Sequence, residues 1–266
     1  MARVLIAGES WVTTSIHTKG FDSFTTVAYQ EGVAGFRDAL EGHGHEVEHL
    51  PCHVAADDFP YEAAGLEDVD VVVLSDIGAN TFLLPNATFL SGEARPNRLA
   101  MLRDWVADGG GLAMVGGYLS FQGFEAKANY RATPLAPVLP VELEPGDDRE
   151  ELPADGRPLV AAPEHPLVAG LPSRWSPILG YQRLLAKPEA QVALTVNGDP
   201  LAVTGSFGAG RTLAFATDIG PHWAPEAFVG SPEFAAFWDR AVRWLAGQPV
   251  DGQANGAATS GGAHGR

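Results

Sequence analysis

A tyrosine stands where the chain is expected to turn sharply out of a strand. Residues 112–115 are apolar, and residues 116–123, which follow them, read Gly-Gly-Tyr-Leu-Ser-Phe-Gln-Gly. The pattern predicts a strand that ends in a tight turn into a helix, the arrangement that presents the nucleophile in α/β hydrolytic enzymes. The residue at the tip of this turn is Tyr118, a poor acyl acceptor at neutral pH because its hydroxyl has an ordinary pKa of about 10. We therefore expect Tyr118 to donate a proton or to hydrogen-bond an oxyanion.

Other polar residues follow the remaining predicted strands. Ligands of open parallel sheets bind outside the carboxyl ends of the strands, so residues at these positions are expected to share one pocket. We expect His222 to be the general base, with Asp218 orienting it or serving as a ligand, and Tyr118 as the proton donor. The expected substrate-binding residues are Glu9, Ser10, Trp11, His17, Lys19, Asp76, Asn80, Ser120, Gln122 and Trp223. Taken singly, each is equally well explained as a cap or turn residue.

A metal ion is an open alternative, and the cofactor is otherwise unknown. His17, His53, Asp76 and His222 offer ring nitrogens and a carboxylate of the kind that holds a catalytic zinc, manganese or iron ion. No compact spacing such as His-x-x-x-His supports this site, since its ligands come from separate strand ends. Cys52, the single cysteine, follows a predicted strand, but no turn or helix start is expected there to lower its thiol pKa. A structural cysteine is the favoured interpretation.

Short β-branched runs alternate with helical patterns along the chain, which is typical of a parallel sheet with crossover helices. The expected strands are residues 3–7, 46–50, 69–74, 112–115, 190–195, 201–206 and 211–217. The expected helices are residues 31–42, 96–108 and 232–246. Residues 208–210, Gly-Ala-Gly, predict a hairpin turn between the last two strands. The predicted fold class is therefore α/β, a flavodoxin-like, doubly wound and mostly parallel sheet with a C-terminal β-hairpin.

Two irregular segments are expected near the pocket. Residues 9–24 are polar without apolar periodicity, which predicts a loop that covers the pocket, an ordinary surface loop or an oligomer contact. Residues 133–185 are rich in proline and form an excursion from the sheet. Within it, Asp148 and Arg149 are expected either to form an exposed ion pair or to belong to a lid in which Arg149 meets an anionic substrate.

The composition of the chain limits the kinds of molecule that it is expected to bind. The chain has 266 residues and a formal net charge of −16, so a phosphate-tracking surface for nucleic acid or an anionic membrane is not expected. A single cysteine excludes an intrachain disulfide, and the N-terminus lacks a signal-peptide pattern, so we expect a cytoplasmic protein. Residues 1–247 are expected to form one domain, and residues 248–266 a disordered tail. A small-molecule substrate and a homo-oligomer are the expected partners.

The turn around Tyr118 resembles the Gly-x-Cys-x-Gly-x-Gln elbow of class I glutamine amidotransferases. Gly116 and Gln122 are in register with that motif, Tyr118 stands at the place of the cysteine, and Ser120 replaces the second glycine. The segment 207–218 is similar to the closing hairpin of the trehalose-utilisation-type branch. Closer resemblance to the branch known as "putative glutamine amidotransferase" is carried by residues 8–11, 17–22, 75–80, 117–121 and 221–223.

The resemblance implies the fold, but its glutaminase activity needs a thiolate, a base and oxyanion donors. The family's base is a histidine followed two residues later by a carboxylate in a His-Pro-Glu run. His222 falls near that position, whereas three residues separate it from Glu226. We therefore expect an enzyme of hydrolase or lyase type, acid–base or metal-assisted, that acts on a small polar metabolite. The alternatives are a non-catalytic metabolite-binding protein or partner-enzyme subunit and, less favoured, a true glutamine amidotransferase.

Overall fold

The computed structural model describes residues 1–250 and is built on an eight-stranded sheet in the order β4-β1-β5-β6-β14-β13-β12-β9. The first five strands in this order run parallel: β4 (Glu46–Leu50), β1 (Arg3–Gly8), β5 (Val71–Ser75), β6 (Gly111–Val115) and β14 (Gly210–Phe215). The other three join by antiparallel pairing: β13 (Asp199–Phe207), β12 (Gln191–Val196) and β9 (Leu159–Val160). The predicted α/β class, with a mostly parallel sheet and a closing hairpin, is confirmed.

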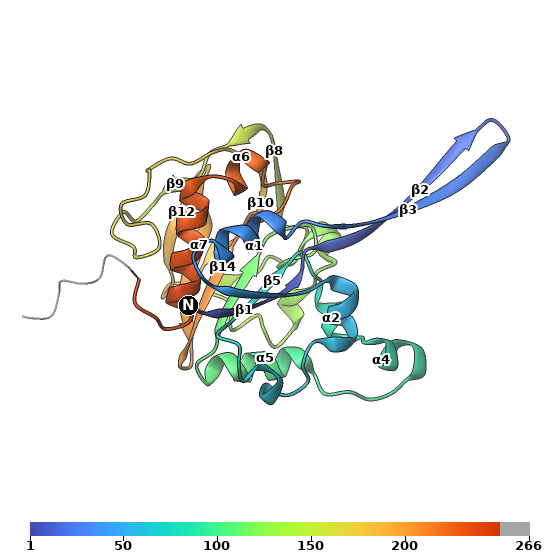
Figure 1. Cartoon of the computed structure of the whole chain (residues 1–266), viewed down its shortest axis with the longest axis horizontal. Helices are drawn as coiled ribbons and strands as arrows, with labels where there is room; N and C mark the ends of the chain where they lie inside the picture. The colour runs from blue at the N-terminus through green and yellow to red at the C-terminus, as the bar shows by residue number, and fades with distance from the viewer. Residues whose placement is uncertain (251–266) are drawn as a thin grey trace, which may run out of the picture.

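Helices cover the sheet (Figure 1). The helix α1 (Ala34–Glu41) packs against α7 (Pro232–Leu245), where the rings of Phe36 and Trp238 meet edge to face at 4.7 Å between centroids. The remaining helices are α2 (Cys52–Asp58), α3 (Ala79–Leu83), α4 (Asn86–Ser91), α5 (Arg98–Ala107) and α6 (Glu226–Val229). Because β5 and β6 lie in the middle of the sheet, all their residues are buried, which explains why both read as continuous apolar runs.

The strand order places a topological switch point between β1 and β5. The chain passes from β1 to β4 at one edge and then crosses to β5 on the other side of β1. Crossovers that leave in opposite directions open a crevice at the carboxyl ends of the two strands, and this crevice is where ligands of open sheets bind. The residues directly after β1 and β5 are Glu9 and Asp76.

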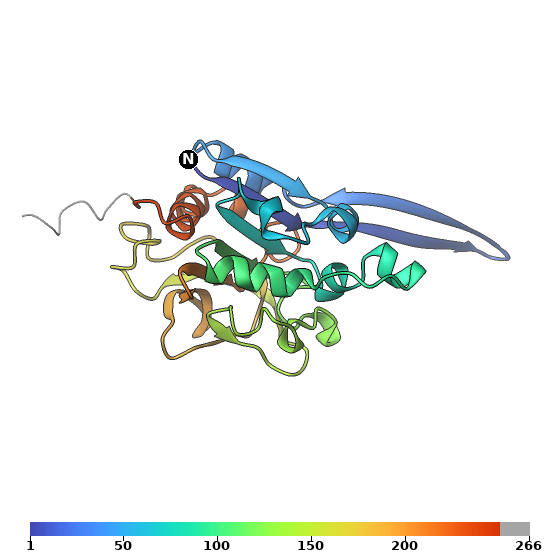
Figure 2. The same cartoon turned by 90° about the horizontal axis from the view of Figure 1, so that it is seen from below.

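The segment predicted as a polar loop over the pocket is instead a long hairpin, which we call the arm. Its strands β2 (Ser10–Lys19) and β3 (Asp22–Glu31) pair antiparallel from Ser10 opposite Glu31 to Lys19 opposite Asp22. The arm projects away from the body of the molecule (Figures 1 and 2). Because neither of its faces is buried against the core, its strands lack the alternation by which a half-buried strand is predicted.

The chain after β6 also differs from expectation, since no α-helix follows the turn at Tyr118. Bends and two short 3-10 turns, Phe124–Ala126 and Tyr130–Ala132, take its place. The backbone has positive φ at Gly117 (130°) and at Phe121 (53°), and a right-handed helix cannot continue through such residues.

The excursion returns to the sheet through small pairings. The strand β8 (Arg149–Gly156) pairs with β10 (Ile178–Gln182), and β7 (Val141–Glu142) pairs with β11 (Leu185–Ala186). One further 3-10 turn spans Ala63–Leu66. Most of the predicted tail, 248–266, lies outside the described residues. No helix within residues 1–250 has the length and hydropathy needed to cross a membrane.

Candidate functional site

Two acidic residues occupy left-handed backbone positions directly after neighbouring parallel strands. Glu9 follows β1 with φ of 49°, and Asp76 follows β5 with φ of 43°. A non-glycine residue in this region costs about 1 kcal/mol or more, and such conformations gather at functional sites. Before Glu9, Gly8 has φ of 117°, and a Cβ atom there would lie 1.8 Å from the carbonyl oxygen of Ser75. Only glycine therefore fits where the two strand ends meet.

Glu9 forms a buried carboxyl pair with Asp218, which follows β14. Only 2% of Glu9 and 5% of Asp218 are exposed, and the two side chains share a hydrogen bond. The Ser75 hydroxyl donates to Glu9 at 2.5 Å, and the Ile219 N–H donates to Asp218 at 2.7 Å. Burial, with the nearby acidic groups, raises the pKa of Glu9 to about 7 and that of Asp218 well above its ordinary value. The pair therefore retains a proton near neutral pH.

Asp76 ties the carboxyl end of β5 to the turn after β6. Its Oδ1 accepts the N–H of Leu119 at 2.6 Å, and its own N–H donates to the Ser120 hydroxyl at 3.0 Å. Burial raises the pKa of Asp76, while the Leu119 N–H and the nearby His222 oppose that shift. In nucleophile-elbow enzymes the N–H of the residue after the nucleophile stabilises the oxyanion. Here the corresponding N–H, that of Leu119, is bonded to a carboxylate of the chain itself.

Tyr118 lies in an aromatic cluster with His222 and Trp223. The Tyr118 ring meets the His222 ring edge to face at 4.4 Å between centroids and lies 5.7 Å from that of Trp223. His222 is exposed, Tyr118 is half-buried, and Trp223 is fully buried against Gly180. The predicted base and the predicted proton donor are therefore in contact at the surface. They lie at the carboxyl edge of the parallel strands, which we call the rim.

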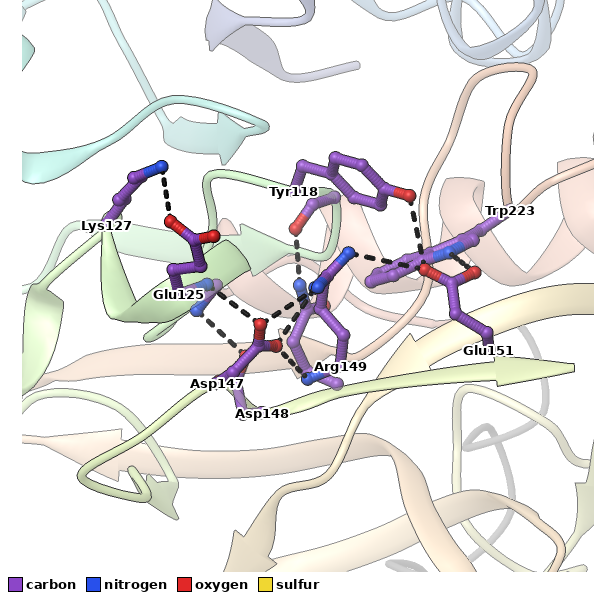
Figure 3. Close-up of polar contacts among 11 residues, drawn as sticks. Tyr118, Glu125, Lys127, Asp147, Asp148, Arg149, Glu151 and Trp223 are labelled. Atoms are coloured by element: carbon purple, nitrogen blue, oxygen red, sulfur yellow. Dashed lines mark hydrogen bonds and ion pairs between the residues drawn. The ribbon is translucent and has the colours of Figure 1, made fainter.

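The excursion reaches this cluster through Glu151 (Figure 3). Glu151 accepts the Tyr118 hydroxyl at 3.2 Å and the Trp223 indole N–H at 3.0 Å. Burial and the adjacent Glu151 carboxylate raise the pKa of Tyr118. The guanidinium of Arg149 lies over the rings of Tyr118 and Phe124, at 4.8 and 4.2 Å from their centroids. Segments far apart in the sequence thus meet around the Tyr118 ring.

Asp147 and Asp148 fix the excursion to the turn, but not in the expected pairing. Asp147, rather than Asp148, binds Arg149, through two hydrogen bonds of 2.9 Å. Asp148 is fully buried and accepts the N–H groups of Gln122 at 3.0 Å and Gly123 at 2.8 Å. Burial raises the pKa of Asp148 to about 6. Since its charge is already matched by Asp147, Arg149 is not placed as a free receptor for an anionic substrate.

The structure brings together five of the predicted residues: Glu9, Asp76, Tyr118, Asp218 and His222. Asp218 was expected to orient His222, but its hydrogen bonds are to other groups. It bonds the Glu9 side chain and accepts the N–H groups of Ile219 and Gly220. Asp76 is the carboxylate whose charge interacts with His222.

Several predicted substrate-binding residues have structural contacts instead. The Ser10 hydroxyl accepts the N–H of Cys52 at 2.8 Å, and the side-chain oxygen of Gln122 accepts the N–H of Arg131 at 3.2 Å. The Ser120 hydroxyl accepts the N–H of Asp76, and Trp223 is the fully buried member of the aromatic cluster. These side chains shape the rim rather than line it.

Other predicted residues lie on the arm or on the helices α2 and α3. His17 stacks on Phe24 at 4.6 Å within the arm, on which Trp11 and Lys19 also lie, and Asn80 is exposed on α3. His53 is exposed on α2 and meets Tyr29 of the arm at 5.3 Å between ring centroids. The topology separates these residues because the chain leaves β1 as an arm and leaves β4 as a helix.

The alternative metal site is not formed. Within residues 1–250, no group of three or more histidine, cysteine or acidic side chains is arranged to hold a metal ion. Of the four candidates, His17 lies on the arm and His53 on α2, whereas Asp76 and His222 lie at the rim.

Cys52 lies close to the rim as the first residue of α2, a helix start that was not expected there. Its Sγ lies 3.7 Å from the carbonyl oxygen of Asp76, and the residue is half-buried. Burial raises its pKa, with the Ser10 hydrogen bonds acting in the opposite direction. Despite the helix start, the thiol does not have the lowered pKa of an activated nucleophile.

Three residues of the site were not anticipated. Ser75 donates to Glu9, Glu151 accepts from Tyr118, and the amide of Gln182 donates to the carbonyl oxygen of Gly117. Ser75 carries a weak signal, as a polar residue at the end of an apolar strand. Glu151 and Gln182 carry none, because they come from the irregular excursion.

The sheet topology and the turn after β6 define a class I glutamine amidotransferase-like protein. The chain belongs to the family described as "Putative glutamine amidotransferase", whose sequence profile matches residues 3–247. The predicted superfamily is thereby confirmed, and a more distant solved structure shares the fold. This structure, a ThuA-like protein from Parabacteroides merdae, shares the fold with a TM-score of 0.57 and 14% identity, over 95% of this chain and 92% of its own.

Two solved structures are much more similar. Both are described as cytoplasmic proteins from Salmonella typhimurium. One is 43% identical with a TM-score of 0.88, over 91% of this chain and 98% of its own. The other is 44% identical with a TM-score of 0.88, over 91% of this chain and 99% of its own. No curated protein matches the chain.

Proposed function

We propose that the chain binds a small polar metabolite at the carboxyl edge of the sheet and acts on it by acid–base chemistry, as a hydrolase or lyase. The observation that carries this proposal is the buried pair of Glu9 and Asp218 beside Asp76 at the switch point. Carboxyl groups that retain a proton near neutral pH are suited to proton transfer, and perturbed groups of this kind gather at active sites.

The contacts around the rim suggest distinct roles. His222 is exposed and lies against Tyr118, so it is placed to take a proton from a substrate while Tyr118 donates one. The Glu9–Asp218 pair stores a proton behind them, and Asp76 supplies the negative charge beside His222. Because acidic groups dominate the rim and Asp147 matches the charge of Arg149, the substrate class is a neutral or cationic polar molecule.

Glutaminase activity is not part of this proposal. Tyr118 is a weak acyl acceptor, the Leu119 N–H is bonded to Asp76, and burial raises the thiol pKa of Cys52. We expect no release of glutamate or ammonia from glutamine, with or without acceptor molecules. Turnover abolished by Cys52→Ala would contradict this expectation, and a Cys52→Ser variant separates loss of the thiol from loss of volume.

The test of the enzyme proposal starts from a ligand. A library of neutral, cationic and anionic metabolites is screened by thermal shift, and products of the hits are followed by NMR. For a turned-over hit, His222→Gln should lower the rate by about a hundredfold or more, since it removes the titrating group while keeping hydrogen-bonding capacity. His17→Gln on the arm is the matched control. Equal rates for the two variants, or hits confined to anions, contradict the assigned site.

A non-catalytic metabolite sensor or enzyme subunit is the second candidate. Two large aromatic side chains near the turn, Phe121 and Trp223, are fully buried and fill space there. In this case a hit from the same screen is recovered chemically unchanged, and His222→Gln alters its affinity only modestly.

We also propose that the chain acts in the cytoplasm, as its two Salmonella relatives are described as cytoplasmic. Fractionation of cells followed by immunodetection tests this location, and recovery with a membrane or secreted fraction contradicts it.

A further inference from the structure

Most of the arm is uncharged, although the protein has a net charge of −16. Residues 11–18 and 23–30, which make up most of its two strands, contain no Asp, Glu, Lys or Arg, although 19% of the whole chain is charged. The charges of the arm lie only at its ends, on Lys19 and Asp22 at the tip and Glu31 at the base. The composition of the arm therefore differs from that of an ordinary solvated surface.

One face of the arm gathers apolar and uncharged side chains. The register places Val12 opposite Tyr29, Thr14 opposite Val27, and Ile16 opposite Thr25, all on the same side of the pleat. Val12 is 60% exposed, Ile16 74% and Val27 67%. We call this set of side chains the apolar face. Its Tyr29 meets the ring of His53 on α2, whereas Val12, Ile16 and Val27 are largely exposed.

On the opposite face of the arm, side chains form hydrogen bonds and ring contacts with one another. The Trp11 indole donates to Gln30 at 2.7 Å, while His17 stacks on Phe24 and hydrogen-bonds the Thr26 hydroxyl at 3.1 Å. The contrast between the faces indicates that any partner docks on the apolar face.

A two-stranded hairpin of this length is not stable by itself in water. Independent stability requires more strands or packing against another element. Its outer edges also lack the usual protection along most of their length, since residues 11–18 and 23–30 contain neither a charged residue nor a proline. An exposed and largely uncharged ribbon of this kind is expected to be covered, either by another strand or by an apolar surface.

A second exposed apolar site lies at the same end of the molecule. The short helix α4 projects on the side from which the arm extends (Figures 1 and 2). Its residues Phe89 and Leu90 are 71% and 74% exposed, and none of its residues is charged. The arm and α4 thus provide two uncharged surfaces that one copy of the chain leaves open.

We infer that the partner of the arm is a second copy of this chain. Two copies, each with a net charge of −16, repel one another over most of their surfaces, so close approach is favoured where charge is absent. A two-fold axis at this end lets each apolar face pack on the partner's α4 while its own α4 is covered in return. Such a reciprocal arrangement is closed, which prevents the free arms from building fibres.

The experiment is light scattering coupled to size-exclusion chromatography of the full chain over a range of concentrations. We expect a dimer, and we expect Ile16→Lys with Val27→Lys to raise its dissociation constant by about a hundredfold or more, because two charges are forced into an apolar contact. Thr13→Lys on the opposite face is the matched control and should leave the dimer intact. Phe89→Lys should weaken the dimer as well, since it alters the counter-surface.

Hydrogen exchange gives an independent reading that does not depend on elution volume. In the dimer the amides of β2 and β3 should be protected, and the double lysine variant should lose this protection while the central sheet keeps its own. A wild-type chain that is monomeric at every concentration overturns the inference. So does a dimer that the double variant leaves unchanged, or one that Thr13→Lys disrupts equally.

Discussion

The carboxyl edge of the sheet and the arm begin at adjacent residues, yet they differ in almost every physical respect. Glu9, at the carboxyl edge, is buried and forms hydrogen bonds with Ser75 and Asp218. Ser10 starts a hairpin whose middle residues bond only their own neighbours across the ribbon. A position directly after a strand therefore does not by itself place a residue in a site. The neighbouring strands must also hold the chain at the edge.

The largest effect is expected from alanine at the two ends of this comparison. Gly8 and Gly20 both have positive φ, but a Cβ at Gly8 would lie 1.8 Å from the Ser75 oxygen, whereas nothing lies within 4 Å at Gly20. Gly8→Ala should therefore lower the free energy of unfolding by about 3 kcal/mol or more, and Gly20→Ala by about 1 kcal/mol, the cost of backbone strain alone. Urea unfolding measures both. Equal losses would show that the edge is not tightly packed.

The sequence predicted the sheet well because its strands are buried. All residues of β5 and β6 are inaccessible, so their apolar runs, Val71–Ser75 and Gly111–Val115, are evident without structural information. The arm was missed because its Thr, Ser and Val residues face solvent on both sides, and no core imposes alternation on them. Local pattern thus reports burial, and it fails where a strand is exposed on both faces.

The same reasoning explains which site residues were predictable. Asp76 directly follows β5 and Tyr118 lies in the turn just after β6, so topology alone brings them together. Glu151 was not predictable, since its place beside Tyr118 depends on the pairing of β8 with β10 inside an irregular segment. The contact of Asp218 with Glu9 rather than His222 depends on side-chain direction, which topology does not specify.

The carboxyl pair predicts a pH dependence that the arm lacks. Because burial raises the pKa of Glu9 from 4.5 to about 7, the folded protein binds this proton more tightly than the unfolded chain does. Its contribution to stability is present below pH 4.5 and is lost as pH rises through about 7. Glu9→Gln mimics the protonated form, so its stability relative to wild type should increase on the order of 2 kcal/mol between pH 4.5 and pH 8.

Thermal and urea unfolding of both proteins across this range measure the effect. Buried histidines titrate in both proteins and cancel in the difference. Asp22→Asn at the exposed tip of the arm is the matched control for replacing a carboxylate by an amide. A difference between wild type and Glu9→Gln that stays constant from pH 4.5 to pH 8 would contradict the shared proton.

A smaller effect is expected where the excursion is fixed to the turn. Asp148→Ala leaves the buried N–H groups of Gln122 and Gly123 without an acceptor, which should cost about 2 kcal/mol in unfolding free energy at pH 7.5. The neighbouring Asp147→Ala removes a partly exposed ion pair with Arg149 and the acceptor of the exposed Glu125 N–H, which should together cost about 1 kcal/mol or less. Urea unfolding measures both losses of unfolding free energy. Their ratio shows whether the excursion is held mainly by the buried hydrogen bonds of Asp148 or by the surface contacts of Asp147. A larger loss for Asp147→Ala would show that the excursion is held from outside.

The smallest stability effects are expected at two exposed histidines, one in each region. His222 packs on Tyr118 at the rim, and His17 packs on Phe24 in the arm, so each loses one ring contact when changed to alanine. Each variant should shift the unfolding free energy by about 1 kcal/mol or less. Only His222→Ala should abolish the thermal shift caused by a rim ligand, because only this ring lies beside Asp76. If His17→Ala abolishes that shift as well, while His222→Ala leaves it intact, the arm rather than the rim contacts the ligand, and the distinction between the two regions fails.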